Sequence, residues 1–177
     1  FIDARNLLSR KQIDAAKTPV LFVELASGQN GTLTPYPGQG VGQTWLGADG
    51  ATITLEQGIL TASRGMGDDL MGSQSLVPKW SKIKHDPQPY TREMHYLDGN
   101  NKISTIFFKC EIRKSKIREV IEIWSVTFRI TKFEEICIYG DLKITNNYYI
   151  DDHEIVRKSL QYHGKTIGYI ITQRLDR

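Results

Sequence analysis

The sequence predicts a mainly β protein, an antiparallel meander curled into an open or partial β-barrel, with one short helix near the amino-terminal end. Two observations support this fold class. From residue 44 to residue 175, apolar or aromatic alternation is interrupted repeatedly by turn residues, which is typical of successive hairpins. No repeat of fixed period and no alternation of strands with helices is present, so a doubly wound parallel sheet is excluded.

The size and composition indicate one globular domain. The chain has 177 residues, of which 40% are apolar and 24% charged. We expect a single domain over 1–177, with a helical segment at 1–17 and a β domain at 18–177. The net charge of +3 is too small to indicate a nucleic-acid surface. No apolar run approaches the roughly 20 residues that a membrane-spanning helix needs.

The first elements are predicted from capping and turn residues. One short helix is expected over 3–16, where Ser9 is a suitable N-cap and Gln12 follows it as in a capping box. An apolar strand is expected over 20–25. The next stretch, 26–42, is rich in Gly, Gln and Pro, and it predicts a long hairpin loop or a disordered tip.

The remaining strands are predicted wherever alternation recurs between turn signals. In chain order they are expected at 44–46, 51–55, 59–62, 91–97, 103–110, 117–131, 136–139, 142–150, 155–162 and 166–175. A turn is expected at 114–116, and Trp124 is expected within a strand, facing the core. The Gly-rich stretch 64–72 is not expected to form a regular strand. The connector 73–89 is expected to be anchored by Trp80 and Ile83.

The two cysteines, Cys110 and Cys137, both lie in strand-like segments. In an oxidising periplasm they would be a natural disulfide pair, and a loop of that length would stabilise the fold by about 3–4 kcal/mol. The alternative is a pair of buried, reduced thiols that act as small apolar side chains. No Cys-x-x-Cys or paired histidine spacing accompanies them, so neither a metal site nor a cofactor is expected.

No group of residues predicts a catalytic centre. The nucleophile-elbow pattern Gly-x-Ser-x-Gly is absent, and the acidic run 151–154 is explained by turn chemistry. The histidines are scattered singly along the chain, at His85, His95, His153 and His163. We therefore expect no enzyme, and a function carried by a surface.

The most plausible binding surface is the corner at 64–70. Its glycines allow a backbone cradle for an anion, but the adjacent Asp68 and Asp69 would repel phosphate. A sheet corner in which Asp68 caps a helical turn is therefore the favoured interpretation. If a binding surface exists, we expect Arg64, Asp68 and Asp69 to approach Trp45 at one end of the sheet. The planar guanidinium of Arg64 would suit sugar carboxylates or acidic residues of a partner.

Three stretches of the chain, 43–71, 90–98 and 146–164, together resemble the YjbF-like (GfcB-like) bacterial lipoproteins, which are associated with capsule and exopolysaccharide secretion. The most specific matches are Asn146-x-Tyr148-Tyr149-Ile150-Asp151 and the following Val156-Arg157-x-Ser159-x-Gln161. The resemblance covers nearly the whole chain, and 109–142 is its least characteristic part.

The resemblance implies a non-catalytic lipoprotein on the periplasmic face of the outer membrane, held by an N-terminal lipid anchor that is absent from this chain. The resemblance also implies that the protein acts together with exopolysaccharide or group 4 capsule secretion proteins. It assigns no catalytic residue to this chain. Two alternatives stay open: a periplasmic carrier of a lipid or glycan in a half-barrel groove, and a glycan-processing enzyme. A wide apolar groove would favour the carrier, and two facing carboxylates in a cleft would favour the enzyme.

Overall fold

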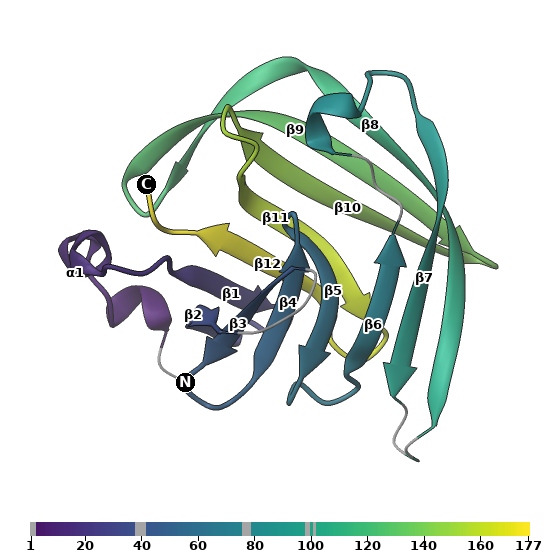
Figure 1. Ribbon diagram of the computed structural model, residues 1–177, viewed down its shortest axis with the longest axis horizontal. Helices are drawn as coiled ribbons and strands as arrows, with labels where there is room; N and C mark the ends of the chain where they lie inside the picture. The colour runs from purple at the N-terminus through teal and green to yellow at the C-terminus, as the bar shows by residue number, and fades with distance from the viewer. Residues whose placement is uncertain (1–2, 38–41, 76–78, 98–99, 101) are drawn as a thin grey trace.

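The chain forms one antiparallel sheet of twelve strands that curls into a nearly closed barrel (Figure 1). This computed structural model describes residues 3–37, 42–75, 79–97, 100 and 102–177. The mainly β prediction, with helix only near the amino-terminal end and in short turns, is confirmed. Among the described residues, no helix is long and apolar enough to cross a bilayer.

The strands follow one another around the barrel in chain order. They are β1 Leu21–Leu25, β2 Asn30–Tyr36, β3 Gln43–Gly47, β4 Thr52–Glu56, β5 Ile59–Arg64, β6 Leu70–Ser75, β7 Gln88–Leu97, β8 Ile103–Ile123, β9 Val126–Tyr139, β10 Leu142–Asp151, β11 Val156–Gly164 and β12 Gly168–Arg174. Backbone pairing joins β1 to β12, with Leu21 opposite Arg174. The sheet instead ends at β5 and β6, two strands that are consecutive in sequence.

The amino-terminal helix is shorter than predicted. The segment 3–16 contains a 3₁₀ turn, η1 (Ala4–Asn6), and a separate helix, α1 (Arg10–Ala15). The capping box is present, because Ser9 Oγ accepts from the Gln12 amide and Gln12 Oε1 accepts from the Ser9 amide. The prediction of one continuous helix is therefore wrong in extent and right in its cap.

Two stretches predicted to lack strands contain them. Strand β2 forms inside 26–42 because it pairs with β1 and β3 and buries Leu33, an arrangement that its Gly and Pro content concealed. Residues 38–41 of that stretch lie outside the described residues. Strand β6 begins at Leu70, inside the Gly-rich stretch, and pairs with β7. Trp80, in the 3₁₀ turn η2 (Trp80–Lys82), and Ile83 are buried as expected.

The predicted turn at 114–116 is also wrong. Strand β8 continues through it with a register shift between Lys114 and Arg118, which is a bulge and not a reversal. The chain turns at Trp124 and Ser125, which adopt φ values of 47° and 65°. Trp124 is thus a half-buried turn residue, and its ring meets Phe22 edge-on at 5.6 Å. Strand β9 likewise runs unbroken through 132–134.

Side chains fill the inside of the barrel. Strands alternate inward and outward positions, and the inward ones form a large apolar cluster that includes Leu33 and Phe108 and a smaller one around Phe133 and Tyr148. A third cluster covers Phe22, whose side chain faces opposite to those of Leu21 and Val23. Here α1 and the β8–β9 turn pack against β1 (Figure 1).

Side chains also join the two ends of the sheet. The Leu70 amide of β6 donates to Ser63 Oγ of β5 at 3.0 Å. The Arg64 guanidinium donates to the carbonyls of Leu70 and Met71 at 3.0 and 3.2 Å. We call the junction of β5 and β6 the seam of the barrel. Side-chain hydrogen bonds close it, in place of the backbone pairing that joins the other neighbouring strands.

Candidate functional site

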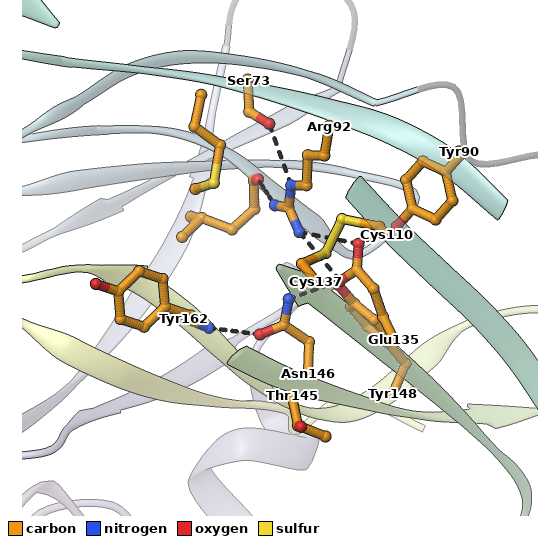
Figure 2. Close-up of a disulfide and its surroundings, with 12 residues drawn as sticks. Ser73, Tyr90, Arg92, Cys110, Glu135, Cys137, Thr145, Asn146, Tyr148 and Tyr162 are labelled. Carbon is orange, nitrogen blue, oxygen red and sulfur yellow. Dashed lines mark hydrogen bonds and ion pairs between the residues drawn. A yellow bond between two sulfur atoms is a disulfide. The ribbon is translucent and has the colours of Figure 1, made fainter. Parts of the chain in front are cut away.

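A charged cluster lies inside the barrel, beside the disulfide (Figure 2). Arg92 of β7 and Glu135 of β9 form an ion pair with Nη1 and Oε2 3.1 Å apart, and their side chains are only 1% and 0% exposed. Both side chains occupy inward-facing positions, one on β7 and the other on β9, and strand β8 lies between these two strands. Two opposite charges this deeply buried need further partners to offset their desolvation.

Glu135 receives those partners from the adjacent strand β10 and from β7, which lies beyond β8. Its Oε2 accepts from Asn146 Nδ2 at 2.6 Å and from Tyr148 Oη at 2.8 Å, while Tyr90 Oη donates to Oε1. Burial alone would raise the pKa of Glu135, but the charge of Arg92 and these donors hold the pKa below its usual value. The carboxylate is therefore ionised, and both of its oxygens accept hydrogen bonds from protein donors. No oxygen of Glu135 is left to exchange a proton with a substrate.

Arg92 completes the cluster on the other side. Its Nη2 donates to the Leu60 carbonyl of β5 at 2.8 Å, and its Nε donates to Ser73 Oγ of β6 at 3.3 Å. One guanidinium thus bridges both ends of the sheet from the inside. We conclude that this cluster holds the barrel together at its seam.

The two cysteines are directly opposite each other in the pairing of β8 with β9. Their sulfur atoms are bonded as a disulfide, with Cα atoms 4.0 Å apart. Cys110, Cys137 and Glu135 bring ligand-type atoms within 4.8 Å of one another. They do not fit a metal ion, because the sulfurs bond to each other and Glu135 is saturated by protein donors.

The corner between β5 and β6 does bring together Arg64, Asp68 and Asp69. Asp69 caps the turn, because its carboxylate accepts from the amides of Gly65 and Met66 at 2.8 and 3.1 Å. The prediction that Asp68 is the cap is therefore wrong. Asp68 is exposed and accepts instead from Thr166 Oγ1, in the connection between β11 and β12.

Trp45 occupies a different position. It is only 2% exposed, and its ring lies under the Arg174 guanidinium, 4.9 Å from centroid to Cζ. It lines a cavity of about 260 Å³ with Leu55 and Thr172 among others, and the three corner residues do not line that cavity. The expected meeting of Trp45 with the corner is absent from the described contacts.

A buried histidine stands behind the corner. His163 Nε2 lies 2.8 Å from Ser63 Oγ, and Ser63 Oγ donates to Asp69 Oδ1 at 3.0 Å. Because the Ser63 proton goes to Asp69, we assign the proton of this contact to His163 Nε2. His163 Nδ1 is then an acceptor without a partner among the described residues.

This arrangement differs from a catalytic triad. In a triad the acid orients the histidine and the histidine activates the serine. Here Asp69 binds the serine, and Ser63 is only 1% exposed. Burial lowers the pKa of His163, against the opposing charges of Asp69 and Asp68, so the ring stays neutral. The scattered histidines of the sequence gave no signal for this contact, since His163 and Ser63 meet only through folding.

A second cavity, of about 440 Å³, opens beside the corner. Gly65 and Met66 contribute to its wall, and the apolar part comes from β1, β2 and β4. Its polar lining includes Asn30, Asp49 and Thr52. We call it the Met66 cavity. An apolar wall with a few polar groups and this volume is typical of a small-molecule site.

Comparison with known proteins gives a family and a fold. The family model described as group 4 capsule polysaccharide lipoprotein gfcB, YjbF matches residues 2–175. The crystal structure of the hypothetical lipoprotein YmcC from Escherichia coli (K12) superimposes with a TM-score of 0.83 at 18% sequence identity, covering 97% of this chain and 90% of that one. At that identity the likeness shows the fold alone. No curated protein matches the chain significantly.

Proposed function

The chain belongs to the YjbF family of group 4 capsule polysaccharide lipoproteins, and from this membership we propose that it is a non-catalytic accessory protein of capsule or exopolysaccharide secretion. We propose further that it works on the periplasmic face of the outer membrane, held by a lipid anchor, beside the secretion proteins. The disulfide supports an oxidising compartment, because such bonds persist outside the cytosol.

One observation supports the non-catalytic part of the proposal: the buried carboxylate of Glu135 and the buried hydroxyl of Ser63 are both fully hydrogen-bonded within the protein. Glu135 is saturated by Arg92 and three further donors. Ser63 is hydrogen-bonded three times, by Asp69, His163 and the Leu70 amide. A nucleophile or a general acid must instead be free to reach substrate.

The corner is our proposed contact surface for a secretion partner. Arg64 and Asp68 are both exposed, whereas Asp69 is needed to hold the turn. The test is the double variant Arg64→Ala/Asp68→Ala in a strain that depends on this protein for polymer export. Export should fall while the protein stays folded and accumulates to the wild-type amount. Its thermal stability should drop modestly, because Arg64→Ala removes the hydrogen bonds to the Leu70 and Met71 carbonyls.

The matched control is Arg113→Ala/Glu134→Ala, which removes an ion pair from the outer face of β8 and β9. This control should leave export unchanged. Full export from the corner variant would remove the corner from the proposal. Hydrolysis of a capsule glycan by the purified protein would overturn the non-catalytic proposal itself.

The Met66 cavity supports a second candidate, a carrier of a lipid or glycan. Gly31 lines this cavity, and a Cβ built on it would meet no atom within 4 Å. The variant Gly31→Ile therefore begins its side chain in open space and should reduce the volume of the cavity, while Thr34→Ile, at an exposed position of the same strand, is the control. A fluorescent fatty acid and labelled oligosaccharides should bind the wild type and the control, and Gly31→Ile should lose that binding. If neither probe binds the wild type, the carrier is excluded.

A further inference from the structure

The outer face of the barrel carries a tyrosine between two lysines. Lys132 of β9, Tyr149 of β10 and Lys158 of β11 are directly opposite one another in the strand pairing, so they form one row across three strands. The Nζ atoms of Lys132 and Lys158 lie 5.9 and 5.7 Å from the centroid of the Tyr149 ring. All three side chains are half-buried.

The positive charge of this row is not neutralised by the protein. Among the described residues, no carboxylate lies within ion-pairing distance of either ammonium group. Acids close to the row in sequence are already engaged: Glu134 by Arg113, Asp151 by Arg157 and Asp152 by Arg118. The β8 bulge opposite Lys132 adds the exposed Lys116. The row is therefore a local excess of cations around one aromatic ring.

We infer that Lys132, Tyr149 and Lys158 form a binding strip for an acidic saccharide whose charge is carried by carboxylates. The two ammonium groups would bind a carboxylate by charge-assisted hydrogen bonds. The ring and the lysine stems offer an apolar surface for the C–H face of a sugar, and the Tyr149 hydroxyl can bond to sugar hydroxyls. Because the lysines are two strands apart, about 9.5 Å between backbones, the ligand would lie across the strands.

The same geometry disfavours a lipid bilayer as the partner. A flat anionic surface is best met by protruding basic and apolar side chains, whereas this row is half-buried in the sheet surface. The next row on this face also carries the acidic Glu134. The strip lies on a different surface from the β5–β6 corner, and its test reads binding directly, so it stands or fails apart from the proposed function.

The barrel offers a matched control with the same layout. Lys109 of β8, Ile138 of β9 and Lys143 of β10 form another outer row, with an aliphatic residue in the place of the tyrosine. Both control lysines are exposed. The variants Lys132→Gln/Lys158→Gln and Lys109→Gln/Lys143→Gln therefore remove equal charge, and only the first removes it from the aromatic row.

The experiment is calorimetric titration of the purified protein with oligogalacturonate and oligosialate, using maltooligosaccharide as the neutral probe. We expect at least one acidic oligosaccharide to bind, and the Lys132→Gln/Lys158→Gln variant to lose about tenfold or more in affinity. Tyr149→Leu should weaken binding, Tyr149→Phe should retain most of it, and the control pair should bind as the wild type does. Melting temperatures show that each variant is folded.

Any of three results would overturn the inference. Neither acidic oligosaccharide binds the wild type, the control pair loses as much affinity as Lys132→Gln/Lys158→Gln, or the neutral probe binds as tightly as the acidic ones. Inorganic polyphosphate that binds tighter than both acidic saccharides, and without dependence on Tyr149, would show a general anion patch. Binding to phosphatidylglycerol vesicles that depends on the two lysines, with no saccharide binding, would assign the strip to a membrane.

Discussion

Arg92 and Glu135 form an ion pair inside the barrel although strand β8 separates their strands in the sheet. The pair reaches across the curvature of the sheet, and Arg92 continues to Leu60 and Ser73 at the seam. Closure of the barrel therefore depends on charged groups that water does not reach.

The first prediction concerns this pair. Glu135→Gln should lower the free energy of unfolding by about 3–5 kcal/mol, because it leaves the Arg92 charge buried without its counter-charge. The measurement is urea denaturation. The double variant Arg92→Met/Glu135→Leu should lose less than the single variant, since it leaves no unpaired charge. A loss below about 1 kcal/mol in Glu135→Gln would contradict the prediction.

The free energy of unfolding should also depend on pH through the protonation of the Glu135 carboxylate. The folded-state pKa of Glu135 lies below its unfolded value near 4.3–4.5, so the unfolded chain binds the proton first as the pH falls. Its contribution is present above about pH 4.5 and is lost as the pH falls toward the folded pKa. Wild-type stability should therefore drop more steeply below about pH 4.5 than that of Glu135→Gln. Parallel curves would show that another carboxylate dominates.

The second prediction concerns the disulfide, which closes a loop across a sequence separation of 27. The variant Cys110→Ser/Cys137→Ser should lose about 3–4 kcal/mol of unfolding free energy in the chain-entropy model. Unfolding of the wild type with and without a reductant provides the measurement. Protein isolated from periplasm without reductant should contain no alkylatable thiol, and two free thiols there would contradict the oxidising placement.

The third prediction concerns His163. Burial lowers the pKa of His163, so its folded-state value lies below the unfolded value near 6.5. The unfolded chain is protonated first on acidification, and stability falls from about pH 6.5 downward. Between about pH 7.5 and about pH 5.5, His163→Gln should lose less stability than the wild type. His153→Gln, at an exposed turn position, should behave as the wild type does.

The fourth prediction tests the seam. Gln161 Oε1 accepts from the Leu60 amide at 2.7 Å, and Gln161 Nε2 donates to the Gly58 carbonyl at 2.8 Å. Gln161→Leu would leave both backbone groups unpaired and should cost about 2–4 kcal/mol. Hydrogen exchange at the Leu60 amide should accelerate, whereas the outward-facing Gln173→Leu should leave it slow. Unchanged exchange at Leu60 would mean that Gln161 does not hold this edge.

The sequence predicted the hairpin order well because each hairpin is a local feature. The β3–β4 and β9–β10 turns follow from Asp49-Gly50 and Gly140-Asp141, which satisfy turn geometry by themselves. The β8 bulge was misread because charged residues in a long exposed strand resemble a turn. The turn at Trp124 was missed because its positive φ depends on packing against Phe22 and neighbours, which no local pattern reveals.

The interior charges did carry a signal that sequence reasoning overlooked. Arg92 shares its parity with Met94 and Tyr96, and Glu135 shares its parity with Phe133 and Cys137. A charge at an inward position predicts a buried partner. Which partner it meets could not be known, because the curvature of the sheet decides it. The corner was predicted as a group, but the capping roles of Asp68 and Asp69 depend on where Thr166 lies.

The pairing of Leu21 with Arg174 has a consequence for how the molecule folds. Each of the other strand pairs joins sequence neighbours, so the meander of β1–β5 and the meander of β6–β12 can each form from local contacts. Joining β1 to β12 closes a loop of nearly the whole chain, so we expect this pairing to be the slow step of folding. Until then each of the two strands exposes an unpaired edge, so we expect newly made chains to be most prone to aggregate in that interval.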